Sequence, residues 1–114
     1  MRFLLLANFL FEISIGAILI YQPGLIHPSQ DLVALYLSRT FGILLCILAI
    51  WSLLLLRYAE NKELLSVGYL MFMLIHAGFA GIQYFYLGNG MASFQVVVIH
   101  GVFALGFLYY FSKN

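Results

Sequence analysis

Four long apolar runs dominate this sequence. They cover residues 3–21, 32–56, 64–87 and 91–111, and each is about 19 to 25 residues long. A helix needs about 20 apolar residues to cross the hydrocarbon core of a bilayer, whereas a membrane β-strand needs only about 9–11 of alternating polarity. The runs therefore predict an all-α fold, an integral membrane bundle of four transmembrane helices, in a single domain over residues 1–114.

The composition agrees with lipid as the main surroundings of the chain. It is 65% hydrophobic and 8% charged, against about 25% charged residues in an average soluble domain. So few charges cannot cover the surface of a soluble domain this small. The net charge of +1 gives no reason to expect a nucleic-acid partner. The lipid bilayer is the expected partner, and a multi-pass membrane location follows.

The loop charges predict an orientation. The cations that flank the runs fall on one side of the membrane if the chain crosses it four times: Arg2, Arg57, Lys62 and Lys113. The opposite loops, residues 22–31 and 88–90, contain no Lys or Arg. Because positively charged loops stay in the cytoplasm, both termini are predicted to be cytoplasmic. A cleaved signal peptide is the alternative for the first run, although that run exceeds the usual core of about 7–15 residues.

Four ionisable residues fall inside the runs at similar depths, namely Glu12, Arg39, His76 and His100. At 1.5 Å per residue they lie within roughly 8 Å of a common level. Such residues cost about 2.5–3.5 kcal/mol each in a bilayer and usually face the bundle interior. We expect Glu12 to pair with Arg39. The pair either fixes the packing of the first two helices or contacts a ligand or a proton path, and a lipid-facing Glu12 is the remaining alternative.

Helical spacing extends this polar set into a seam. Asn8 lies one turn before Glu12, and Gln83 lies two turns after His76, so each pair shares a helix face. The seam is predicted to bind a ligand or to serve packing alone, and no catalytic residue is predicted. Its members are Asn8, Glu12, Arg39, His76, Gln83 and His100.

The two histidines suggest four kinds of chemistry. Imidazoles on neighbouring helices are suited to ligate a b-type haem, and together with Glu12 they make the set used for iron or zinc. A quinone is a further candidate, and histidine also carries protons near neutral pH. The spacing is diagnostic for none of these, so the cofactor is left unknown and no metal site is predicted. The single cysteine, Cys46, is expected to serve packing.

Three short motifs resemble the DoxX-like superfamily of small bacterial membrane proteins, particularly its uncharacterised four-helix members. They are Gln22-Pro23-Gly24 after the first run, Ser38-Arg39-Thr40-Phe41-Gly42 in the second and His76-Ala77-Gly78-Phe79-Ala80-Gly81 in the third. The resemblance implies a four-helix bundle in a bacterial cytoplasmic (inner) membrane. Some DoxX-type proteins are linked to quinone-coupled sulfur or thiol chemistry, and this chain has no paired cysteines for a thiol role.

A second similarity is to the small multidrug resistance transporters. These proteins have about this length, four helices and an essential glutamate in the first helix, a position that Glu12 matches. The similarity implies proton-coupled transport and a pathway built from two copies of the chain.

The leading functional prediction is a non-enzymatic membrane protein. Its seam binds a small apolar or amphipathic ligand, or the chain is an accessory subunit of a larger membrane complex. One alternative is a proton-coupled small transporter that uses Glu12. The other is a haem- or quinone-linked redox protein that uses His76 and His100. A homo-oligomer is compatible with each.

Overall fold

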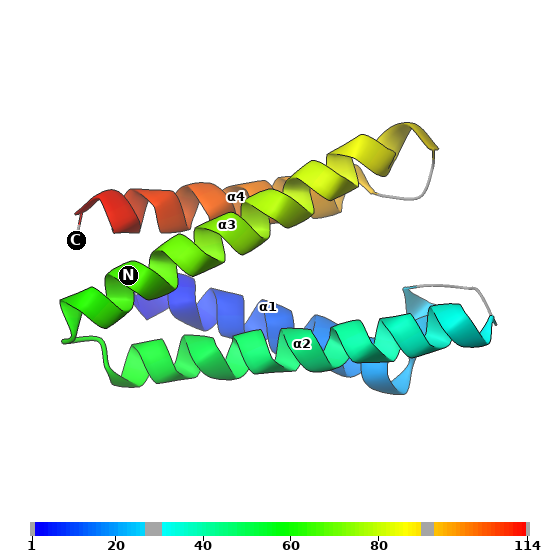
Figure 1. Cartoon of the computed structure of the whole chain (residues 1–114), viewed down its shortest axis with the longest axis horizontal. Coiled ribbons are helices and arrows are strands. Elements are labelled where there is room, and N and C mark those ends of the chain that lie inside the picture. The colour runs from blue at the N-terminus through cyan, green and yellow to red at the C-terminus, as the bar shows by residue number, and fades with distance from the viewer. Residues whose placement is uncertain (1, 27–30, 90–92, 114) are drawn as a thin grey trace. The chain divides into compact units, whose positions relative to one another are not determined.

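The computed structural model describes residues 2–26, 31–89 and 93–113, and within these ranges it contains helices and no strand. Figure 1 shows the order of the elements. They are α1 (Arg2–Tyr21), the short 3₁₀ turn η1 (Pro23–Leu25), α2 (Leu32–Arg57), α3 (Lys62–Tyr86), the 3₁₀ turn η2 (Leu87–Asn89) and α4 (Phe94–Lys113). All four α-helices are long and apolar enough to cross a membrane. The predicted all-α architecture with four candidate membrane spans is confirmed.

Helix caps explain where the observed bounds differ from the apolar runs. The side-chain oxygen of Asn61 accepts a hydrogen bond from the Leu64 N–H at 2.9 Å, so α3 begins at Lys62, before the run predicted from residue 64. The hydroxyl of Ser93 accepts from the Val96 N–H at 3.3 Å, and α4 begins directly after it. The predicted start of the fourth helix, residue 91, lies outside the described residues.

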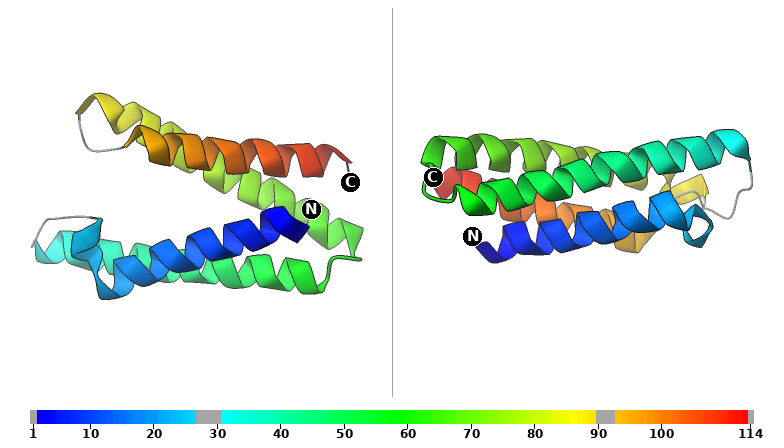
Figure 2. Two further views of the ribbon diagram at one scale, coloured as in Figure 1. Left: turned by 180° about the vertical axis from the view of Figure 1, so that it is seen from behind. Right: turned by 90° about the horizontal axis from the view of Figure 1, so that it is seen from below.

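The contacts divide the chain into two compact units, and each is an antiparallel pair of helices. One unit holds α1 and α2, and the other holds α3 and α4. Figures 1 and 2 show the two members of each pair lying side by side. We call these units the α1–α2 hairpin and the α3–α4 hairpin. The single domain expected from the sequence stays a prediction.

The α1–α2 hairpin is held by a close approach of two backbones. A Cβ on Gly16 would stand 2.8 Å from the carbonyl oxygen of Gly42, and one on Gly42 would stand 2.7 Å from that of Gly16. Small residues of this kind let membrane helices pack closely without a hydrophobic driving force. The buried stripe of α1 repeats at helical spacing: Leu5, Asn8, Glu12, Gly16 and Leu19.

The α3–α4 hairpin is held mainly by rings. Tyr69, Phe72 and Phe107 are completely buried. The rings of Phe72 and Phe107 stack with centroids 5.0 Å apart, and those of Tyr69 and Phe107 lie 6.1 Å apart. Offset stacking at these separations is the favourable geometry for aromatic pairs. The two hairpins therefore use different packing, backbone contact in the first and ring stacking in the second.

Candidate functional site

Two imidazoles meet directly inside the α3–α4 hairpin. His76 on α3 and His100 on α4 place their Nδ1 atoms 2.8 Å apart. Since one nitrogen must carry the hydrogen for this contact to be attractive, one ring donates and the other accepts. His76 is fully buried, and His100 is 8% exposed. The structure thus brings together two of the residues predicted for the polar seam, which are 24 positions apart in the chain.

Aromatic rings hold the plane of the His76 imidazole. It stacks on Phe103 with centroids 4.9 Å apart and an interplanar angle of 20°, and it lies almost parallel to Phe107 at 5.9 Å. The rings of His100 and Phe79 pack edge to face with centroids 5.2 Å apart. Tilting the His76 ring out of this plane would break the stack. The rings therefore hold the plane in which its Nδ1 meets that of His100.

The geometry of the pair leaves no room for a metal ion bound between the two Nδ1 atoms. Two nitrogens on opposite sides of a metal stand about 4 Å apart if each metal–nitrogen bond is about 2.0 Å long, the value for zinc. The Nδ1 atoms of His76 and His100 are 2.8 Å apart. Within residues 2–26, 31–89 and 93–113, no three side chains of His, Cys, Asp or Glu gather as a metal-binding group.

Glu12 and Asn8 lie on the buried stripe of α1, as their spacing predicts. Both side chains are fully buried, and the Asn8 amide donates to the hydroxyl of Ser52 on α2 at 2.9 Å. Ser52 is a seam residue that sequence reasoning missed. Its hydroxyl also donates to the Leu48 carbonyl one turn earlier at 3.3 Å, a local bond that makes serine unremarkable in a membrane helix. The sequence did offer one signal for Ser52, since it is a polar residue within the second apolar run.

The predicted Glu12–Arg39 pair is not formed, because the register of the α1–α2 hairpin separates the two residues. Asn8 lies level with Ser52 and Gly16 with Gly42, which puts Arg39 beside the last turn of α1. That turn is about 10–13 Å along the helix axis from Glu12. Arg39 is exposed, whereas Glu12 is buried. Helical side chains also lean toward the helix N-terminus, which aims Arg39 farther from Glu12.

Gln83 shares a helix face with His76 but does not reach it. Its side chain is half-buried, and the two residues are seven positions apart, about 10 Å along α3. Within the α3–α4 hairpin the structure pairs His76 with His100, and within the α1–α2 hairpin it places Asn8 and Glu12 on one buried stripe. Arg39 and Gln83 lie nearer the ends of their helices.

Two further buried polar atoms were not predicted as site atoms. The hydroxyl of Tyr69 and the indole nitrogen of Trp51 are buried and have no hydrogen-bond partner in the part of the chain that the structure describes. A buried polar atom without a partner costs free energy. The helical spacing predicts that Tyr69 shares the interior face of the third run with His76, but not that its hydroxyl lacks a partner. The burial of the Trp51 nitrogen was not predicted.

Comparisons with protein-family models, with curated proteins and with solved structures find no match to this chain. The resemblance to the DoxX-like superfamily stays a prediction.

Proposed function

We propose that this chain is a small multi-pass membrane protein that carries protons within the membrane, and that the His76–His100 pair is its proton-transfer element. The observation that supports the proposal is the 2.8 Å contact between the two Nδ1 atoms. Ionisable residues buried in membrane helices commonly belong to proton relays. Histidine is suited to that role because its imidazole gains and loses a proton near neutral pH.

The transfer itself conserves protons and involves no redox change. One ring accepts a proton at Nε2 and passes its Nδ1 proton across the hydrogen bond. The partner ring accepts that proton at Nδ1 and releases its own Nε2 proton. The hydrogen bond then runs in the opposite sense, so the pair must return to its first state before it transfers another proton the same way. Back-transfer of the protons would cancel their net movement, so a net flux requires rotation of the rings between transfers. The stacking of His76 on Phe103 slows that rotation.

Glu12 is a second candidate proton carrier, on the other hairpin. Its carboxyl group is fully buried on α1, near the middle of a helix long enough to cross a membrane. This is the role that the similarity to small transporters predicts for it. The proposal places both chain termini on the cytoplasmic side, in agreement with the loop charges, and a bacterial inner membrane follows from the DoxX-like resemblance. The ligand-binding, accessory-subunit and redox functions stay predictions.

Proton flux into vesicles tests the proposal. The full chain is reconstituted into liposomes that contain a pH-sensitive dye, and a pH gradient is imposed with valinomycin and potassium present. We expect the wild-type chain to dissipate the gradient faster than empty liposomes. His76→Phe and His100→Phe each keep a ring in the stack and remove the nitrogens, so each is expected to reduce the flux to the level of empty liposomes.

Tyr84→Phe is the matched control, since Tyr84 lies on the same helix as His76 and is 70% exposed. It removes one ionisable group and should leave the flux unchanged. Flux in both histidine variants equal to that of the wild type would contradict the proposal, as would a wild-type flux no greater than that of empty liposomes. Glu12→Gln tests whether the α1–α2 hairpin also takes part in proton transfer. Loss of flux in this variant would make Glu12 part of the proton path.

A further inference from the structure

The place of Arg39 in the α1–α2 hairpin calls for a different explanation from the core pair that the sequence predicts. The register puts it beside the last turn of α1, and α2 continues past that point by about two turns toward Leu32. Figure 1 shows α2 running beyond the end of α1. Arg39 thus lies level with the end of a helix whose 20 residues match the thickness of the hydrocarbon core.

Arg39 lies on an exposed face of α2 whose neighbouring side chains are apolar. Tyr36 and Ile43, one turn on either side of Arg39, are 68% and 54% exposed, and spacings of three and four residues place them on the same face. Ser38 and Gly42, on the adjoining face of α2, are buried. A stripe that is apolar and exposed on a membrane-spanning helix faces lipid. Arg39 is the cation on that stripe.

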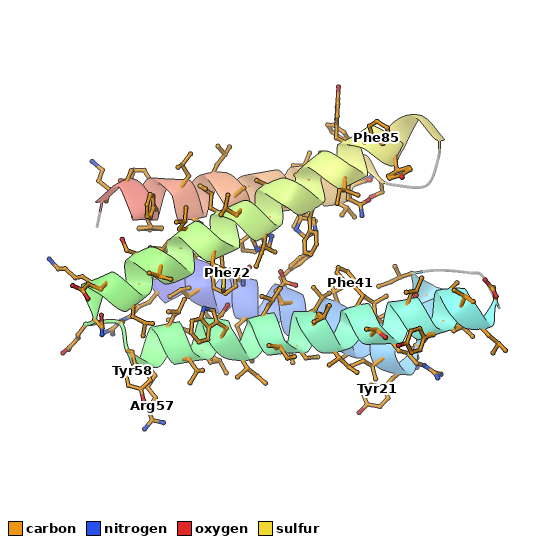
Figure 3. All side chains as sticks on the ribbon, in the orientation of Figure 1. Tyr21, Phe41, Arg57, Tyr58, Phe72 and Phe85 are labelled. Atoms are coloured by element: carbon orange, nitrogen blue, oxygen red, sulfur yellow. The ribbon has the colours of Figure 1, made fainter. Side chains whose placement is uncertain are left out.

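Such a cation is stable only where its guanidinium reaches the headgroups. Helical side chains lean toward the N-terminus of their helix, and the N-terminus of α2 is the end that projects past α1. A long side chain can keep its stem along apolar surface while its charge reaches the interface. Figure 3 shows Tyr21 at the same end of the hairpin, directed away from α2. Exposed tyrosines are typical of the membrane interface.

The charges near Arg39 select an anion as its ligand. Residues 22–38 contain no other Lys or Arg, and Asp31 is the one acidic residue among them. Asp31 is eight positions away, about 12 Å along the chain even if all of it were helical, and its carboxylate accepts a hydrogen bond from the Val33 N–H. A guanidinium presents a planar fork of donors that matches phosphate. The hydroxyl of Tyr36 adds a donor one turn nearer the helix N-terminus.

We propose that Arg39, assisted by Tyr36, binds the phosphate group of a membrane phospholipid at the loop end of the α1–α2 hairpin. The site is independent of the proton-transfer function proposed above and does not share residues with it.

Lipid retention measured by native mass spectrometry tests this site. The full chain is purified in a neutral detergent and mixed with equal amounts of phosphatidylglycerol and monoglucosyldiacylglycerol, a lipid without phosphate. We expect the wild type to retain phosphatidylglycerol preferentially. Arg39→Gln is expected to weaken that retention about tenfold, as for loss of one hydrogen-bonded contact to a charged group. Arg39→Lys keeps the positive charge but lacks the planar donors of the guanidinium. Its retention of phosphatidylglycerol should lie between that of the wild type and that of Arg39→Gln.

Arg57→Gln is the matched control. Arg57 is also an exposed arginine of α2, and it ends the helix at the opposite end of the hairpin (Figure 3). The proposal requires the loss in Arg39→Gln to exceed the loss in Arg57→Gln, and Tyr36→Phe to lower retention measurably. Equal losses in the two arginine variants would overturn it, and so would equal retention of the two lipids by the wild type. Displacement of phosphatidylglycerol by millimolar inorganic phosphate would overturn the lipid as the ligand.

Discussion

The side-chain amide of Asn8 on α1 donates a hydrogen bond to the hydroxyl of Ser52 on α2 at 2.9 Å, and both groups are fully buried. This contact and the Gly16–Gly42 approach set the register of the α1–α2 hairpin. The register decides the surroundings of Arg39, because a shift of two turns would bring it level with Glu12. Two contacts between inconspicuous residues therefore separate a charge pair that the sequence favours.

Removing this hydrogen bond should destabilise the hairpin modestly. Asn8→Ala and Ser52→Ala are each expected to lower the free energy of unfolding, with a coupling energy of about 0.6–1.7 kcal/mol between them, the range for polar contacts between membrane helices. Reversible unfolding in mixed detergent and denaturant micelles of the two single variants and the double variant measures this coupling. Strictly additive losses would show that the amide and hydroxyl do not interact.

Adding a methyl group at the close approach should be far more costly than adding one elsewhere. In Gly16→Ala the new Cβ meets the Gly42 carbonyl oxygen and the Cys46 sulfur at 2.8 Å, so the helices must move apart, at a cost of about 1–3 kcal/mol. Gly78→Ala is the control, since a Cβ there has nothing within 4 Å. It is expected to be neutral or stabilising, by up to about 1 kcal/mol. Similar unfolding midpoints for the two variants would contradict the observed helix contact.

Glu12 and Arg39 should behave as independent residues. A double-mutant cycle with Glu12→Gln and Arg39→Gln is expected to give additive changes in unfolding free energy, within about 0.3–0.5 kcal/mol, as for residues without shared contacts. A buried ion pair behaves differently, because removal of either charge leaves the other uncompensated. A coupling energy well above that limit would restore the pair predicted from the sequence and contradict the register.

Removing the Tyr69 hydroxyl should not weaken the α3–α4 hairpin. Tyr69→Phe keeps the ring against Phe107 and Tyr110 and removes a buried hydroxyl that has no hydrogen-bond partner in the described part of the chain. We expect the stability to stay unchanged or to rise by about 1 kcal/mol. Tyr109→Phe, at a 57% exposed position, is the control with no expected effect. A loss greater than about 1 kcal/mol in Tyr69→Phe would reveal a partner for the hydroxyl.

The orientation predicted from the loop charges can be measured directly. A green fluorescent protein fused after Asn114 folds in the cytoplasm, so the fusion should be fluorescent in whole bacterial cells. An alkaline phosphatase fused at the same place should be inactive, because that enzyme needs the oxidising periplasm. The reverse result would place the C-terminus outside and contradict the assignment made from Arg57, Lys62 and Lys113.

The helices were predictable from the sequence because each depends on a local quantity. A run of about 20 apolar residues suffices to specify a membrane span, since a helix satisfies its backbone hydrogen bonds within the segment. The burial of Asn8 and Glu12 on one stripe of α1 was predictable for a similar reason, as spacing along a helix specifies the face. The start of α3 depended on Asn61, whose capping bond is not visible in hydropathy.

The pairing of side chains across helices was harder to predict, because depth in an apolar run leaves the register of two helices open by several residues. His76 and His100 lie close because the stacked rings of Phe72, Phe103 and Phe107 align α3 with α4. Arg39 and Glu12 are apart because the contact between Gly16 and Gly42 fixes a register of α1 and α2 that places them at different levels. Apolar composition thus determined that the chain forms four membrane-length helices. Interlocking of individual side chains between helices determined which polar groups meet, since lipid solvates every register of an apolar helix pair almost equally well.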